Sequence, residues 1–408
     1  MSQQMYLLDN AVQHYDWGSP TRIHELLGTE PDGAPAAELW LGAHPSAPSL
    51  VALPDDAPHQ RRSLLEVVRS APDAMLGPHV AERFGPRLPF LLKVLAADRA
   101  LSLQVHPKPH AARAGFNREN RAGLPAESPQ RSFHDDQHKP EMVVAVSQFE
   151  ALAGFRSPRA ILSLLDGLRG PLVDGVRDEL RADRSDRGMR RAFSLLLAAR
   201  RHPECATHIR ATVDAVHERL EAGSPFDRAD ATVLQLAAEH PGDPGAIASL
   251  MLNRVTLEPG EAMFTPSGQV HAYLSGLGVE IMASSDNVLR AGLTSKLVDE
   301  KALVECATFT PAPPVHPTLE TSGGRGQAHS FRAPVDEFAL TLADVDASEP
   351  VALHGDGPRV VLCLDGKLTL STARATVTLE RGTSAFVPHA LGPLTASGQG
   401  QLVCAWVP

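Results

Sequence analysis

The stretch VTLEPGEAMFTP, residues 255–266, decides the fold, because a second copy of its pattern, VTLERGTSAFVP at 377–388, occurs 122 residues later. In each copy a strand ends at a glycine turn and a new strand follows. A proline closes the second strand, where no ladder N–H is needed. Two copies of one β-unit explain this echo most economically.

Working outward, the repeated pattern resembles the cupin jelly roll, a double-sheet β-sandwich. Between residues 157 and 249, Leu-, Ala- and Arg-rich stretches with three- and four-residue spacing predict helices. The Pro-rich stretch 310–318 and the Gly/Ser-rich stretch 321–326 mark a connection into the second β-unit. We therefore predict a mainly β protein of cupin jelly-roll β-sandwich domains with an α-helical insertion. The predicted division is a discontinuous catalytic cupin domain (1–156 plus 250–320), a helical insertion domain (157–249) and a C-terminal non-catalytic cupin-like domain (321–408).

Ahead of the insertion, LPFLLKVLAADRALSLQVHP at 88–107 reads as two apolar runs around a polar turn at 97–99, which predicts a β-hairpin. The two copies of the repeat diverge after their prolines. The first copy continues to His271, whereas the position 122 residues later is Pro393. Only the first copy can therefore place a metal ligand there.

Composition favours a protein that acts on a small molecule. The 408 residues are 43% hydrophobic and carry a formal net charge of −10, without a basic stripe that would bind nucleic acid. The chain shows no basic leader and no run of 18 apolar residues, so we expect a cytoplasmic protein without membrane contact, and we favour a monomer. The four cysteines form no CxxC pair, so a metal would be held by His, carboxylate or amide groups.

Polar residues with the chemistry of a metal site recur at three places. On a strand, Ser102, Gln104 and His106 share one face, while the intervening apolar residues point to the other. HKPE, at 138–141, holds titratable groups at a strand entrance next to a proline with a fixed φ. His271 precedes a polar segment with Asp286, Asn287 and Arg290, expected as a loop. Each pattern alone is more typical of a solvated strand or a charged turn than of a metal site, but together they predict one site.

The motifs QVHP (104–107), HKPE (138–141), HAYLSG (271–276) and SDNVLRAGLT (285–294), with a helical segment between the second and third, resemble those of type I mannose-6-phosphate isomerases of the cupin superfamily. The likeness extends to the front of the chain. YDWG (15–18) and ELWLGAHP (38–45) resemble the opening blocks of that family, so the resemblance spans most of the first 310 residues.

The resemblance implies an aldose–ketose isomerase that interconverts mannose 6-phosphate and fructose 6-phosphate through a cis-enediol-type intermediate, in mannose metabolism and GDP-mannose biosynthesis. It also implies one Zn²⁺ per chain. In that family one Gln, two His and one Glu hold the zinc, and these match Gln104, His106, Glu141 and His271. Imidazole and carboxylate suit zinc and leave room for substrate.

The same resemblance places Arg290 and Asp286 in the pocket, Arg290 to stabilise enediolate charge and Asp286 to orient it or to move a proton. Lys139 and His138 are further candidates for proton transfer, because a desolvated lysine gives up its proton more readily. Ser102, Lys139 and Arg290 are the expected substrate contacts. A phosphate-binding role for Lys108 is doubtful, since family members commonly carry an acidic residue and then a lysine after the His-Pro.

Three alternatives stay open at this stage. The first is a non-catalytic zinc cupin that acts as a sugar sensor or structural module, which would not need Lys139, Asp286 and Arg290. The second is a metal-dependent dioxygenase on the same fold, which would favour iron and a His-rich or facial-triad ligand set. The third is an isomerase of a different phosphorylated sugar.

Overall fold

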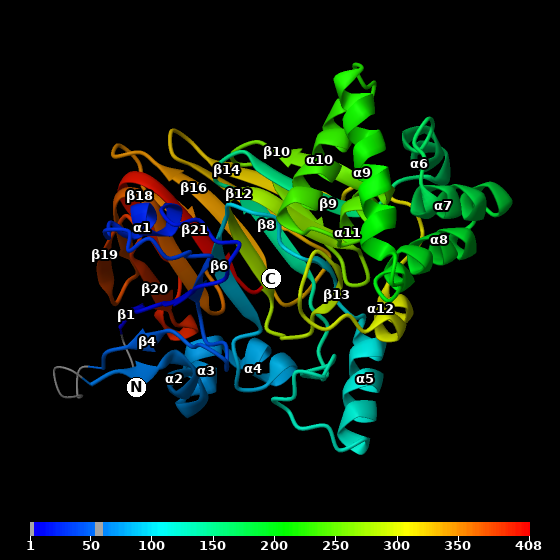
Figure 1. Ribbon diagram of the computed structural model, residues 1–408. Helices are drawn as coiled ribbons and strands as arrows, with labels where there is room; N and C mark the ends of the chain where they lie inside the picture. Colours follow the sequence, from blue (N-terminus) through cyan, green and yellow to red (C-terminus); the bar gives the residue numbers. More distant parts are fainter. Residues whose placement is uncertain (1–3, 54–59) are drawn as a thin grey trace.

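The computed structural model describes residues 4–53 and 60–408, whose strands form a ten-stranded sheet, a nine-stranded sheet and one two-stranded ribbon. Figure 1 shows the C-terminal strands, in orange and red, on one side of the molecule, and helices α6 to α11, in green, on the opposite side. This arrangement confirms the predicted mainly β fold with a helical segment in the middle of the chain.

The ten-stranded sheet is organised around one long strand, β12, which pairs with β6, β7, β8 and β9. The strands of this sheet are β2 (Ala11–Gln13), β3 (Glu38–Leu41), β6 (Phe90–Ala97), β7 (Leu103–Val105), β8 (Glu141–Ala145), β9 (Phe149–Phe155), β10 (Leu252–Leu257), β11 (Ala262–Thr265), β12 (His271–Ala283) and β13 (Leu289–Gly292).

Strand β12 is thirteen residues long, and all four of its partner strands run antiparallel to it.

The predicted hairpin at 88–107 is wrong in its pairing, although both strands exist. β6 pairs with the Gly276-to-Ala283 half of β12, and β7 pairs with β12 at His271. The two strands therefore follow each other along β12 instead of pairing with each other. The apolar runs located both strands, but a partner far along the chain outcompeted the local turn.

The nine-stranded sheet forms the C-terminal unit, in the order β1-β20-β18-β21-β16-β15-β14, with β17 and β19 as side pairings. Its strands are β1 (Tyr6–Leu7), β14 (Thr318–Gly323), β15 (Gln327–Arg332), β16 (Ala339–Val345), β17 (Val351–Leu353), β18 (Arg359–Ser371), β19 (Thr376–Glu380), β20 (Ser384–Val387) and β21 (Leu394–Trp406). Two strands of this sheet lie outside the predicted C-terminal range of 321–408, at least in part. β1 pairs with β20, so the start of the chain joins the C-terminal sheet, and β14 begins before residue 321.

Helices α6 to α11 fill the segment between β9 and β10 and lie on the right-hand side of the molecule in Figure 1, whereas α2 to α5 lie along its lower edge. Helix α6 begins after Ser157, whose Oγ accepts a hydrogen bond from the Ala160 N–H at 3.2 Å, with Pro158 in the first turn. The remaining elements are α1 (Arg22–Leu27), β4 (Leu50–Val51), β5 (Arg62–Ser63), α2 (Leu64–Ser70), α3 (Pro72–Leu76), α4 (Pro78–Phe84), α5 (Pro109–Arg121), α6 (Pro158–Leu164), α7 (Pro171–Ala182), α8 (Asp186–Ala199), α9 (Cys205–Glu221), α10 (Asp227–Glu239), α11 (Gly245–Ala248), η1 (Ser249–Met251), α12 (Glu300–Cys306) and η2 (His389–Leu391). Among the described residues, no helix has both the length and the hydropathy needed to span a bilayer.

The hydrophobic cores join these parts. Phe155 of β9 packs edge-on against Phe193 of α8, with ring centroids 5.2 Å apart, so the helices share a core with the ten-stranded sheet. A second core contains Phe90 of β6 together with Phe338 and Phe386 of the C-terminal unit. Burial of this shared apolar surface holds the two β-units together.

Candidate metal centre and active site

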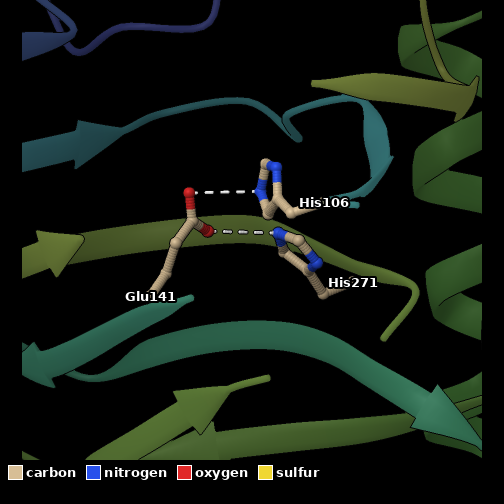
Figure 2. A group of neighbouring side chains, drawn as sticks. All are labelled: His106, Glu141 and His271. Carbon is tan, nitrogen blue, oxygen red and sulfur yellow. Dashed lines mark ion pairs between the residues drawn. The ribbon is translucent and has the colours of Figure 1, made fainter. Parts of the chain in front are cut away.

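Three buried side chains converge inside the ten-stranded sheet. His106 follows β7, Glu141 begins β8 and His271 begins β12, so three strand ends meet at one point. One ligand atom from each residue lies within 4.8 Å of the others, and the residues are 1%, 4% and 3% exposed. Figure 2 shows both imidazoles directed at the carboxylate of Glu141. The structure thus brings together three of the four predicted metal ligands.

The fourth predicted ligand, Gln104, lies beside them. Strand β7 places it directly opposite His271 of β12, and its side chain lines the adjoining cavity. Its amide nitrogen donates to Ser102 Oγ at 3.1 Å, so the carbonyl oxygen is the atom available to a metal.

Hydrogen bonds to backbone carbonyls fix the orientation of both imidazoles. His106 Nδ1 lies 2.7 Å from the Asn287 carbonyl, and His271 Nδ1 lies 3.1 Å from the Gln269 carbonyl. A carbonyl only accepts, so Nδ1 carries the proton in each ring and Nε2 presents a lone pair. These Nε2 atoms lie 3.1 and 3.3 Å from the oxygens of Glu141. Three acceptors therefore face one another, an arrangement that a bound cation would stabilise.

The protonation states agree with metal binding. Burial lowers the pKa of His106 to about 4, which keeps the imidazole neutral at physiological pH. Burial opposes ionisation of Glu141, but His106 and Lys139 outweigh it and hold the pKa of this carboxyl well below its usual range. Lys139 Nζ lies 3.2 Å from Glu141 Oε1. A neutral His106 imidazole and an ionised Glu141 carboxylate are forms that zinc requires of its ligands.

A cavity of about 600 Å³ opens next to these ligands. Of the predicted catalytic and substrate residues, Ser102, Lys139, Asp286 and Arg290 all line it. His138 does not belong to this lining, because its Nε2 contacts Glu337 of the C-terminal unit at 2.7 Å. The predicted catalytic role of His138 therefore has no geometric support.

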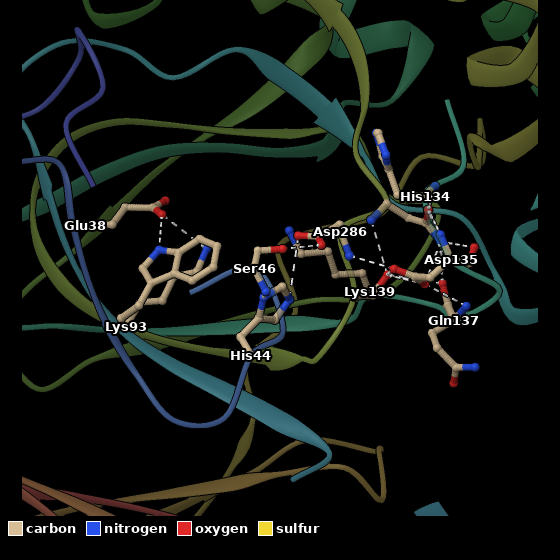
Figure 3. A network of polar contacts seen from close by, with 12 residues as sticks. Glu38, His44, Ser46, Lys93, His134, Asp135, Gln137, Lys139 and Asp286 are labelled. Atoms are coloured by element: carbon tan, nitrogen blue, oxygen red, sulfur yellow. Dashed lines mark hydrogen bonds and ion pairs between the residues drawn. The ribbon is translucent and has the colours of Figure 1, made fainter. Parts of the chain in front are cut away.

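Arg290 and Asp286 differ from expectation in their surroundings. Arg290 lies on strand β13 opposite Gln104, not in a loop. Asp286 accepts from Ser46 Oγ at 3.0 Å and faces His44 Nε2 at 3.6 Å, so its nearest partners come from the front of the chain (Figure 3). Residues four apart on an extended segment do not meet as they would on a helix, and no ion pair between Asp286 and Arg290 occurs in the described parts of the chain.

A buried charge network beside the cavity was missed by the sequence analysis. Lys93 Nζ lies 3.5 Å from a carboxylate oxygen of Glu38 (Figure 3) and 3.5 Å from one of Glu280. Trp40 Nε1 donates to Glu38 at 2.6 Å. Burial and the nearby Glu141 raise the pKa of Glu280 to about 7. One ammonium cannot neutralise two carboxylates, so Glu280 holds its proton more tightly. The sequence does contain an indication of this network: Lys93 lies inside the apolar run FLLKVLAA, and a buried charge needs charged partners.

Asn287 is a second residue whose role sequence reasoning did not identify. It is fully buried, and its carbonyl orients His106. Its side-chain Oδ1 accepts from the His134 N–H at 2.7 Å, and its Nδ2 donates to the carbonyls of Asp135 and Gln137, each at 2.8 Å. These bonds hold the segment that leads to Lys139 and Glu141 against the β12–β13 connection.

Lys296 completes the polar lining of the cavity. Its Nζ lies 5.7 Å from the centre of the Tyr15 ring. Burial and the neighbouring Arg290 lower the pKa of Lys296. Lys93 and Lys139 are paired with buried glutamates, whereas no ion pair is found for Arg290 or Lys296 within residues 4–53 and 60–408. Two unpaired cations on one wall favour an anionic ligand.

Comparisons with known proteins agree with this geometry. Residues 5–158 match the family model of the phosphomannose isomerase type I catalytic domain, and residues 327–407 match that of the mannose-6-phosphate isomerase cupin domain. The mannose-6-phosphate isomerase of Escherichia coli K12 is 38% identical over 403 residues, covering 98% of both chains. The Bos taurus enzyme is 32% identical, covering 95% of this chain and 94% of its own.

Solved structures show the same relationship. A zinc-bound mannose 6-phosphate isomerase superimposes with a TM-score of 0.86 at 34% identity, covering 99% of both chains. A variant of the Salmonella typhimurium phosphomannose isomerase gives a TM-score of 0.87 at the same identity and coverage. The cupin folds and the family resemblance expected from the sequence motifs are confirmed.

Proposed function

Because the chain belongs to the type I phosphomannose isomerase family, and is a zinc-dependent isomerase of mannose 6-phosphate and fructose 6-phosphate, we propose that Gln104, His106, Glu141 and His271 hold its zinc. The observation that carries this assignment is the pair of imidazole lone pairs facing the Glu141 carboxylate at 3.1 and 3.3 Å. Bound there, zinc supplies positive charge next to the sugar oxygens.

The unpaired cations define where the substrate phosphate would bind. Arg290 and Lys296 lie on the cavity wall without carboxylate partners in the described residues, and each is partly desolvated. A phosphate dianion would relieve the repulsion between them. We place the phosphate near Lys296 and the reacting carbons deeper, towards Ser102 and Lys139.

Isomerisation moves a proton between C2 and C1 while negative charge develops on the sugar oxygens. Lys139 is the buried ammonium nearest to the metal ligands, so we assign proton exchange to it. Arg290 stabilises the charge of the cis-enediol-type state, because its guanidinium stays protonated even when burial lowers its pKa. Asp286 accepts a sugar hydroxyl at the rim of the cavity. His138 has no part in this scheme.

The wider assignments follow from the substrate. A charged sugar phosphate is an intracellular metabolite, so we place the enzyme in the cytoplasm, in mannose metabolism and GDP-mannose biosynthesis, and favour a monomer. For the domains, we propose a catalytic unit that excludes β1 and ends before β14, a helical insertion at 157–249, and a C-terminal unit that includes both strands.

Metal removal tests the central assignment. We expect about one zinc per chain by elemental analysis, loss of isomerase activity on mannose 6-phosphate after chelation, and recovery on adding zinc. Full activity in protein shown to be metal-free would contradict the assignment. A panel of phosphorylated sugars at equal concentrations would show how strictly the enzyme selects its hexose.

A further inference from the structure

The helical insertion reaches the active-site cavity through the C-terminal end of α10 and the residue that follows it. Glu239 and His240 line the cavity. Glu239 Oε2 accepts from the Ala100 N–H at 2.8 Å, and Arg99 Nη2 donates to the Glu239 carbonyl at 3.0 Å. The insertion is therefore bonded to the turn that follows β6, on one wall of the cavity.

On another wall, an ion pair of the insertion holds the backbone of Thr294. Arg200, which follows α8, contacts Asp243 Oδ2 through Nη1 at 2.7 Å, and its Nη2 donates to the Thr294 carbonyl at 2.6 Å. Asp243 Oδ2 also accepts from the Thr294 N–H at 3.2 Å. One Arg–Asp pair thus binds both backbone polar groups of a residue that lines the cavity.

The turn held in this way has an unusual backbone. Leu293, the preceding residue, has a φ of 55°, and no other non-glycine residue of the described chain has a positive φ. This conformation costs a non-glycine residue on the order of 1–2 kcal/mol, so surrounding contacts must maintain it. The packing is close: a Cβ added at Gly245 would lie 3.0 Å from Leu293 Cγ. Asp243 Oδ1 fixes that glycine through its N–H at 2.8 Å.

The turn leads directly to Lys296. We propose that Arg200 and Asp243 are positioning residues, which hold the 293–296 turn so that Lys296 faces the cavity and binds the substrate phosphate. This inference rests on the phosphate position assigned under the proposed function. It gives the helical insertion a role in substrate affinity without any contact to the reacting carbons.

A second Arg–Asp pair in the insertion provides a matched control. Arg219 Nε lies 2.9 Å from Asp230 Oδ2, and its Nη1 donates to the Leu164 carbonyl at 2.7 Å. Like the first pair, it joins an ion pair to a backbone carbonyl, and Asp230 is fully buried. Neither residue lines the cavity. Loss of this pair should weaken folding without changing the substrate site.

The experiment compares Arg200→Ala, Arg219→Ala, Lys296→Ala and the double variant Arg200→Ala/Lys296→Ala in zinc-loaded enzyme. We expect Arg200→Ala to raise KM for mannose 6-phosphate about tenfold with little change in kcat or zinc content. The same substitution should have little further effect once Lys296 is Ala, because it acts through that residue. Arg219→Ala should lower Tm and leave KM unchanged.

The outcomes separate the two levels of inference. A raised KM in Lys296→Ala with a wild-type KM in Arg200→Ala would overturn the positioning role and leave the phosphate assignment intact. An unchanged KM in Lys296→Ala would overturn both. If Arg200→Ala does not fold, Arg200→Lys decides: it keeps the charge but loses the two-pronged contact. A severalfold rise in KM supports the role, and a wild-type KM contradicts it.

Discussion

The two β-units share a framework but differ in the chemistry of their interiors. Both follow the same path through a glycine turn, at Gly260 with φ 87° and at Gly382 with φ 81°. The echo continues beyond the stretch noticed in the sequence, since Gly276 and Gly398, again 122 residues apart, have φ values of 124° and 112°. Gly276 lies in β12 and Gly398 in β21, and both strands are thirteen residues long.

The functional positions differ between these matched frames. His271, a proposed metal ligand, corresponds to Pro393, and Glu280 of the buried charge network corresponds to the apolar Leu402. The comparison teaches that backbone geometry is maintained by glycines and apolar residues, whereas activity depends on a few polar substitutions in one copy.

Replacing the metal ligand should give the largest difference between the units. We expect His271→Ala to lose zinc and essentially all isomerase activity, because the remaining ligands cannot complete the site. Pro393→Ala, the matched change in the second unit, should retain both. Elemental analysis and an isomerase assay on the two purified variants check this, and zinc loss in Pro393→Ala would break the comparison.

Arg290 of the catalytic unit and Arg359 of the C-terminal unit should differ in effect: loss of Arg290 should lower kcat, and loss of Arg359 should lower stability. Arg290→Ala should reduce kcat on the order of 10² to 10³, with zinc content and thermal unfolding close to wild type. Arg290→Lys should restore only part of the rate, because an ammonium lacks the planar two-pronged geometry. Steady-state kinetics distinguish this from a binding role, which would appear as a higher KM at unchanged kcat.

Arg359 of the C-terminal unit should show the opposite behaviour. It is fully buried and donates to the carbonyls of Gly355, Pro388 and Gly392. Arg359→Ala would remove all three of these hydrogen bonds, at a cost of about 3–5 kcal/mol in unfolding free energy. Urea denaturation should reveal the loss, while kcat per folded molecule stays at the wild-type value. A large fall in kcat would give the second unit a catalytic role.

The pH dependence of stability should differ between the units through Glu280. Its pKa of about 7 lies above its ordinary value of 4.5, so the folded state keeps a proton that the unfolded state releases. Stability should therefore fall as pH rises from 4.5 to 7, by roughly 3 kcal/mol. In metal-free protein, Glu280→Gln should remove this slope, whereas Leu402→Met in the second unit should keep it. Parallel pH profiles for wild type and Glu280→Gln would refute the shifted pKa.

Replacing the turn glycines, Gly260 and Gly382, should change the free energy of unfolding by the smallest amounts of the substitutions compared between the two units. Gly260→Ala meets no atom within 4 Å and should cost only about 1 kcal/mol for its positive φ. Gly382→Ala should cost more, because the added Cβ would lie 2.4 Å from the Leu26 carbonyl oxygen. Equal losses of unfolding free energy in the two variants would show that this contact relaxes freely.

Local patterns in the sequence predicted the repeat, the helical segment and the residues that converge at the metal centre. Alternation along β7 predicted that Gln104 and His106 lie near each other, because neighbouring positions determine strand geometry, and both lie beside the candidate metal centre. The pairing of β6 and β7 with β12 was not predictable in this way, since it depends on a strand far along the chain. The contacts of Lys93 with Glu280, of His138 with Glu337 and of Arg200 with Thr294 were not predictable either, because each joins residues that are far apart in the sequence.

The most direct test of the difference between the units is an anomalous-diffraction map of zinc-loaded crystals, collected at the zinc absorption edge. The account predicts one strong peak per chain, within bonding distance of His106, Glu141 and His271 and next to Gln104, and none in the C-terminal unit. A peak among residues 327–407, or no peak beside Glu141 in active enzyme, would contradict it.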